Sequence, residues 1–99
     1  MPNTNYKRGY KVERDVVNQY RKLGHIAYRS SGSHTPFDVT VHLDTHILVI
    51  QLKRTKKKGI NFDKDIKSLR DAKTTAKKEF WIYRDYEKKG NKWQKIEVD

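Results

Sequence analysis

The sequence contains no cysteine, a single methionine and only two prolines in 99 residues. Without cysteine the chain has neither a disulfide nor a thiolate ligand for a metal. It also has no apolar run near the roughly 20 residues of a membrane span, and its start lacks the basic-then-apolar pattern of a secretory signal. These absences predict an intracellular protein with no membrane partner, whether cellular or virus-encoded and acting in a host cell.

Acidic residues are scarce as well. The chain has 12 Asp and Glu and 23 Lys and Arg, so its formal net charge is +11. This excess favours a polyanion as partner, with nucleic acid ahead of an acidic membrane surface. Hydrophobic residues make up only 34% of the chain. We therefore expect one domain over residues 1–99 with a thin core, of the size that often gains stability from a partner subunit.

A predicted hairpin organises the rest of the chain. Residues 46–52 form a short, β-rich apolar run, which predicts a strand that is covered on both faces. Residues 37–43 alternate, so that Phe37, Val39, Val41 and Leu43 are expected on one face and Asp38, Thr40 and His42 on the other. With a turn at 43–46, the hairpin brings Asp38 to the end of the second strand, where Gln51 and Lys53 share a face.

Two helices and three further strands complete the predicted fold. Apolar spacing predicts a helix over 6–23 that stops at Gly24, with Glu13 on or beside its buried face, where a pairing lysine is the ordinary interpretation. Asn61 is expected to cap a second helix over 62–77 with the stripe Phe62, Ile66, Leu69, Ala72 and Ala76. Strands are expected at 25–30, 79–84 and 92–98, with a turn at 87–91. The order α-β-β-β-α-β-β predicts an α/β fold with a mixed five-stranded sheet and two helices.

The hairpin residues have the chemistry that metal-dependent phosphodiester hydrolysis requires, which is oxygen ligands for Mg²⁺ or Mn²⁺ and a cation near the attacked phosphate. Our hypothesis makes Asp38 the central ligand, helped by the amide oxygen of Gln51, the backbone carbonyl of Leu52 and, directly or through water, Glu13. Lys53 would orient or activate water and neutralise phosphate charge. As ordinary structure, Lys53 is a solvated lysine at a strand end and Asp38 caps a turn.

Basic and hydroxyl side chains flank this hairpin. The loop 30–36 offers hydroxyls and backbone N–H groups to phosphate, with His34 as a further candidate contact. A basic run leaves the second strand beside the suspected site, and its DNA-binding candidates are Arg54, Lys56, Lys57 and Lys58. Trp81 and Trp93 are expected in the core or at a dimer interface rather than as platforms for bases.

Four motifs together resemble the archaeal and phage Holliday-junction resolvases of the PD-(D/E)XK nuclease superfamily. They are Arg8-Gly9-x-x-x-Glu13-Arg14, the run Arg29-Ser30-Ser31-Gly32-Ser33, Pro36-Phe37-Asp38 for "PD" with one residue inserted, and Gln51-Leu52-Lys53 for "ExK". The resemblance covers about residues 7–54. It implies a small restriction-endonuclease-like fold and a metal-dependent endonuclease that cleaves branched DNA as a homodimer.

The resemblance also implies residue roles. Glu13, Asp38 and Gln51 are then metal positions, Lys53 is catalytic, and Ser33 lies near the scissile phosphate. Arg8 and Arg29 are implied phosphate contacts, together with the loop that holds Ser31. For the dimer we expect an exposed aromatic surface near Phe80, Trp81 and Trp93.

Gln51 departs from the family pattern, which has an acid there. An amide oxygen binds a hard cation but brings no charge, so a weaker metal site is expected. Three interpretations stay open: a natural variant, an engineered Glu→Gln trap, or an inactive DNA-binding module of the same fold. A small basic RNA-binding protein is a fourth, which needs only the positive charge.

Overall fold

The computed structural model describes residues 4–30, 36–85 and 92–99, with side chains from Tyr10 onward. Two helices and a five-stranded sheet make up this part of the chain. In chain order they are α1 (Thr4–Lys22), β1 (Ile26–Arg29), β2 (Val39–His42), β3 (Ile47–Thr55), α2 (Asp63–Asp71), β4 (Lys77–Arg84) and β5 (Trp93–Val98). The predicted α/β fold and its element order are confirmed.

The sheet is mixed and its strands lie in chain order, β1-β2-β3-β4-β5. β3 and β4 run parallel, and the other neighbouring pairs run antiparallel. The parallel pair needs a crossover, which α2 provides. β3 is therefore an inner strand with β2 on one side and β4 on the other.

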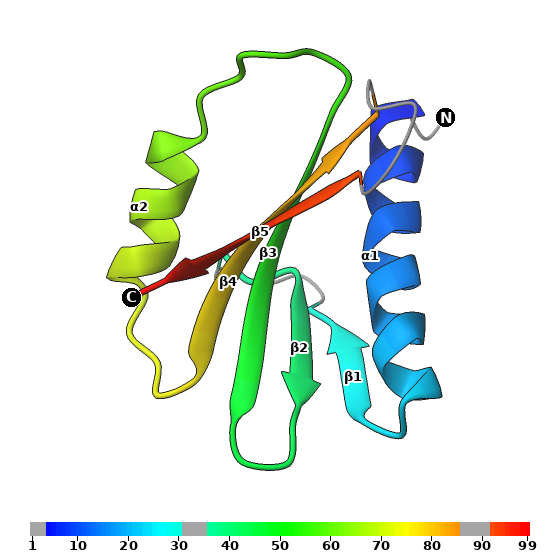
Figure 1. Ribbon diagram of the computed structural model, residues 1–99, viewed down its shortest axis with the longest axis vertical. Helices are drawn as coiled ribbons and strands as arrows, with labels where there is room; N and C mark the ends of the chain where they lie inside the picture. The colour runs from blue at the N-terminus through cyan, green and yellow to red at the C-terminus, as the bar shows by residue number, and fades with distance from the viewer. Residues whose placement is uncertain (1–3, 31–35, 86–91) are drawn as a thin grey trace.

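The two helices lie on opposite faces of the sheet (Figure 1). The alternation along β4 shows this, because Trp81 joins the cluster under α1 whereas Phe80 and Ile82 join the cluster under α2. α1 contacts β1, β2 and β3, and α2 contacts β4 and β5. None of the described helices is long and apolar enough to cross a membrane.

α1 follows the predicted helical spacing and presents Val12, Val16 and Val17 to the sheet. Gly24 follows its end with a φ of 92°, a left-handed backbone that glycine adopts without strain. The N–H groups of Gly24 and His25 donate to the carbonyls of Arg21 and Tyr20, which satisfies two orphan acceptors of the last turn. The chain then turns directly into β1.

α2 is shorter than predicted, because it ends at Asp71 rather than near residue 77. Ala72 already has an extended backbone, and Lys77 pairs with Leu48 as the first residue of β4. The Lys78 ammonium donates to the carbonyls of Arg70 and Ala72, so it satisfies acceptors at the helix end. The predicted stripe is therefore correct for Phe62, Ile66 and Leu69, which pack into the cluster under α2. It is wrong for Ala72, which is the C-cap residue, and for Ala76, which lies beyond the helix.

The structure also corrects the hairpin strands. β3 is longer than predicted and includes Lys53 to Thr55, since its pairing with β4 continues as far as Thr55 opposite Arg84. β2 is shorter and begins at Val39, one residue after Asp38. Phe37 therefore lies before the strand and packs against the cluster under α2, not on the face of Val39 as predicted.

The expected exposed aromatic surface is wrong. Phe80 and Trp81 are 0% and 1% exposed. Trp93 is half-buried, with its ring edge-on to the rings of Trp81 and Tyr83. These aromatic side chains pack into the hydrophobic clusters on both faces of the sheet, so the thin core depends on them.

Candidate active site

Asp38 lies at the point where β2 parts from β3. Its backbone N–H donates to the Ile50 carbonyl at 2.8 Å, and its own carbonyl accepts from the Ser30 N–H at 2.9 Å. Its side chain then accepts a hydrogen bond of 2.7 Å from the Leu52 backbone N–H. The hairpin therefore carries Asp38 to the Gln51–Lys53 end of β3, as predicted.

The Asp38 carboxyl has a perturbed acidity. Burial raises its pKa to about 6, against the lowering effect of the Leu52 N–H. Glu13 raises the pKa further, whereas Lys53 and Arg29 lower it. The carboxyl thus lies within the electrostatic reach of one acid from α1 and of two cations, from β1 and from β3.

Gln51 is buried, and its Oε1 has no hydrogen-bond partner among the described residues. Its neighbours Ile50 and Leu52 belong to the cluster under α1, so the Gln51 side chain projects to the opposite face, beside Phe80 of β4. A buried carbonyl oxygen without a partner destabilises the fold by about 1–3 kcal/mol. A cation or a donor from a ligand would satisfy this oxygen.

The Leu52 backbone also faces the fork, which is the place beside Asp38 where β2 and β3 separate. In a β-strand the N–H and C=O of one residue point to the same edge. Because the Leu52 N–H reaches the Asp38 carboxylate, its carbonyl is directed to the same side of β3. The Leu52 carbonyl, which we predicted as a ligand, therefore lies on the edge of β3 that faces Asp38.

Lys53 projects from the same face of β3 as Gln51, two residues along the strand. Its ammonium lies 3.6 Å from the Asp65 carboxylate of α2. The sequence had not led us to Asp65 as a partner of this lysine. Its position three residues after Phe62 and four before Leu69 places it beside the buried stripe of α2, a signal that was available in the sequence.

Glu13 and Arg29 form an ion pair of 3.0 Å between α1 and β1, with side chains 18% and 32% exposed. The Arg29 guanidinium also lies over the Tyr10 ring, 4.0 Å from its centroid. The partner of Glu13 is therefore this arginine and not the lysine that we expected. Arg29 Nε is buried without a hydrogen-bond partner among the described residues, so the guanidinium retains one unused donor.

A hollow of about 400 Å³ opens beside this ion pair and is lined by Tyr10, Arg14, Val17, Asn18, Arg21 and Arg29. Three guanidinium groups make it electropositive. Arg21 is anchored there, because its Nε donates to the Ala27 carbonyl at 2.9 Å. We had predicted neither Arg14 nor Arg21 as a DNA contact, although their spacing of seven residues puts them on one side of the helix.

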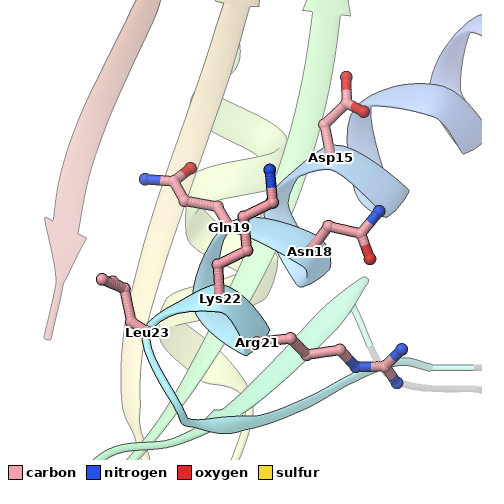
Figure 2. Close-up of a pocket in the computed structure, with 6 residues that line it drawn as sticks. All are labelled: Asp15, Asn18, Gln19, Arg21, Lys22 and Leu23. Atoms are coloured by element: carbon pink, nitrogen blue, oxygen red, sulfur yellow. The ribbon is translucent and has the colours of Figure 1, made fainter.

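A second hollow lies on the outer side of α1 near its end. Figure 2 shows Arg21 leaving the helix to one side, with Gln19 and Leu23 on the other. Asp15 and Lys22 also line this hollow, so its charges are mixed. It shares no residue with the fork at Asp38.

The basic run after Lys53 divides into two parts. Arg54 is held by the Asp85 carboxylate, which accepts from its Nε and from its terminal nitrogen at 2.9–3.1 Å. This pairing raises the Arg54 pKa and joins β3 to the end of β4. Lys56, Lys57 and Lys58 instead lie exposed in the loop after β3.

Four other predicted contacts cannot be placed. Ser31, Ser33 and His34 lie outside the described residues, and the Arg8 side chain lies in the part of α1 whose side chains are not described. Their roles stay predictions.

Oxygen donors at the fork fit a hard divalent cation. In the part of the chain that the structure describes, no group of three or more His, Cys, Asp and Glu side chains is arranged to hold a metal. The donor set is mixed instead, with the Asp38 carboxylate, the unpartnered Gln51 amide oxygen and the Leu52 carbonyl. Carboxylate, amide and backbone oxygens are ligands that Mg²⁺ and Mn²⁺ accept.

Comparison with known proteins identifies a family and a similar solved structure. A family model described as archaeal Holliday junction resolvase (Hjc) matches residues 4–99. The fold is similar to the 1.6 Å structure of Archaeoglobus fulgidus Hjc, a Holliday junction resolvase from an archaeal hyperthermophile, with a TM-score of 0.63 and 21% identity over 88% of this chain and 73% of that chain. A search of curated proteins gives no significant match.

Proposed function

The chain belongs to the archaeal Holliday junction resolvase family, and we propose that it cuts branched DNA by divalent-metal-dependent hydrolysis at the fork between β2 and β3. One observation carries the location. The Asp38 carboxyl, with its pKa raised to about 6, and the unpartnered Gln51 oxygen lie at the same end of β3. Perturbed acids and unsatisfied buried polar atoms gather at functional sites.

Asp38, Gln51 and the Leu52 carbonyl would hold Mg²⁺ or Mn²⁺, with Glu13 joining directly or through a water. When bound, the ion supplies Lewis-acid stabilisation for the charge that develops on the phosphate. It would also satisfy Gln51 Oε1 and keep Asp38 ionised at neutral pH. Because Gln51 adds no charge, we expect weaker metal binding than an acid at that position would give.

Lys53 is the proposed catalytic cation. Its ammonium donates to the scissile phosphate or to the attacking water, and its charge offsets the negative charge of the transition state. Lys53 lowers the pKa of Asp38, which shows that its ammonium lies within electrostatic reach of this proposed metal ligand and supports the role.

Two basic surfaces would bind the arms of the junction. The exposed Lys56, Lys57 and Lys58 follow β3 directly, and Arg14, Arg21 and Arg29 line the hollow beside α1. Phosphate contacts of this kind position a duplex without reading its sequence. We propose a homodimer on the symmetry of the substrate, because a four-way junction offers two equivalent strands and a two-fold pair of sites would cut both.

The neutral Gln51 also favours a second function, an inactive DNA-binding module of the same fold. Such a module would retain the basic surfaces and bind junctions without cutting them. The experiment that tests the first function therefore has to measure binding and cleavage separately.

The test uses a labelled four-way junction, a duplex of one arm and a single strand, each with Mg²⁺, Mn²⁺ or EDTA. We expect nicks in the junction with either metal and none in EDTA. Lys53→Ala should bind the junction and fail to cut, whereas Lys73→Ala, an exposed lysine beyond the end of α2, should cut normally. Tight junction binding without cleavage under every metal would support the inactive module instead.

A further inference from the structure

We propose that Asp65 of α2 is a positioning residue for Lys53. Asp65 supplies the carboxylate that Gln51 does not. The inference rests on the proposed function, since it concerns the proposed catalytic lysine. It assigns a role in the site to the crossover helix, which none of the sequence motifs includes.

The geometry of β3 shows why Lys53 needs a partner. Gln51 and Lys53 project from one face of the strand, so an acid at position 51 would stand beside the ammonium. Gln51 brings a neutral amide there. The Lys53 ammonium lies instead 3.6 Å from the Asp65 carboxylate of α2.

Asp65 is well anchored for this purpose. The Asn61 side chain accepts a 2.7 Å hydrogen bond from the Asp63 N–H, an Asx turn that orders the chain just before α2. The predicted cap by Asn61 is wrong, because the N-cap residue is Phe62 and no side chain of the described residues caps the helix. Phe62, Ile66 and Leu69 pack into the cluster that includes Phe80 and Ile82 of β4. The backbone of Asp65 is therefore held at a fixed place relative to the sheet.

A lysine has four rotatable methylene groups, so an ammonium without a partner spreads over many rotamers. Asp65 restricts Lys53 to those that lie over the sheet near the fork. The two side chains are 40% and 37% exposed, so water screens the pair and the fold gains little from it. A loss of activity without a loss of stability would therefore separate positioning from a structural role.

The experiment compares Asp65→Asn and Asp65→Glu with Asp63→Asn, a matched control because Asp63 is an exposed acid in the same first turn of α2. Single-turnover cleavage at saturating protein, junction affinity in EDTA and the melting temperature are measured for each. We expect Asp65→Asn to cut about three- to fivefold more slowly, in line with the loss of an exposed ion pair. Its affinity and melting temperature should hold, Asp65→Glu should recover most of the rate, and Asp63→Asn should match the wild type.

A double-mutant cycle tests whether an acid at position 51 can replace Asp65 as the partner of Lys53. In a Gln51→Glu background the ammonium regains an acid on its own strand, so Asp65→Asn should then slow cleavage less than twofold. A defect of the same size in both backgrounds would overturn the proposal. It would equally be overturned if Asp65→Asn cut at the wild-type rate or faster, or if Asp63→Asn were equally impaired.

NMR provides a readout that does not depend on cleavage. The order parameter of the Lys53 terminal methylene should fall in Asp65→Asn and not in Asp63→Asn. An unchanged order parameter would count against positioning even in a protein that does not cut. Full cleavage by Lys53→Ala is a different failure, because it would remove the proposed function and not only the role of Asp65.

Discussion

The Leu52 backbone N–H donates a hydrogen bond to the Asp38 carboxylate, 14 residues away in the chain, where β2 and β3 diverge. β2 pairs with β3 only as far as Val39 opposite Ile50, whereas β3 continues beside β4 to Thr55. The edge of β3 beyond Ile50 therefore lacks its strand partner, and a carboxylate takes the place of the next backbone acceptor. The fork is thus built by stopping one strand early and letting its neighbour run on.

Asp38→Asn should stabilise the metal-free protein at neutral pH. A carboxyl whose folded pKa of about 6 exceeds its ordinary value of 3.8 binds protons more tightly in the native state. Ionisation therefore destabilises the fold as pH rises from about 4 to about 6, by up to about 3 kcal/mol at 1.36 kcal/mol per pKa unit. Urea unfolding in EDTA should show the variant more stable at pH 7.5 and nearly equal to wild type at pH 3.5.

The sign of the stability difference at pH 7.5 is decisive. A structural carboxylate with a lowered pKa would make the wild type more stable than Asp38→Asn at that pH. Asp44→Asn is the control, since Asp44 is an exposed acid in the turn between β2 and β3. A less stable Asp38→Asn at pH 7.5 would show that the carboxylate is satisfied in the absence of a cation.

Mg²⁺ should raise the melting temperature of the wild type and not of Asp38→Asn, because a ligand that binds only the native state stabilises it by mass action. Gln51→Glu should increase the shift at a given Mg²⁺ concentration, since it adds a charge to the donor set. Gln51→Leu should decrease it, and should also raise the metal-free stability by removing the unpartnered oxygen. Equal Mg²⁺ shifts in all four proteins would place the metal elsewhere.

The sequence predicted the backbone of this site well, and its failures have physical causes. The apolar run 46–52 and the alternation before it were enough to pair Asp38 with the end of β3, because those patterns depend on local periodicity. The Glu13–Arg29 and Lys53–Asp65 pairs were missed because each joins a helix to a strand, and local periodicity does not specify how a helix packs on the sheet. Phe37 was assigned to the wrong face because β2 starts after it, and strict alternation holds only within a strand.

Salt dependence should separate the two parts of the basic run. Arg54 is held by Asp85, so Arg54→Gln should destabilise the fold, whereas Lys56, Lys57 and Lys58 are exposed in the loop. Junction affinity should fall with log salt, and each lysine that contacts phosphate contributes about 0.9 to the slope. Measured by fluorescence anisotropy, Lys57→Gln should lower the slope by up to that amount with an unchanged melting temperature. A slope close to zero for the wild type would argue against nucleic acid as the partner.

The two members of the Glu13–Arg29 pair act on Asp38 in opposite directions. Glu13 raises the Asp38 pKa and Arg29 lowers it. Glu13→Gln removes the acid and leaves the cation, so the Asp38 pKa should fall. Arg29→Met removes the cation and leaves the acid, so the pKa should rise. NMR titration of the Asp38 carboxyl carbon in metal-free protein measures both shifts.

Lys11→Gln provides the control, because Lys11 is an exposed cation of α1 and is not among the charged groups that shift the Asp38 pKa. Each change also breaks a partly buried pair and leaves one charge without its partner, so both variants should lose stability. Glu13→Gln and Arg29→Met should both lose stability, but their effects on the Asp38 pKa should have opposite signs. The titration therefore separates electrostatic coupling from general disruption of the fold. Shifts of the same sign in both variants would show that the pair acts on Asp38 through packing and not through charge.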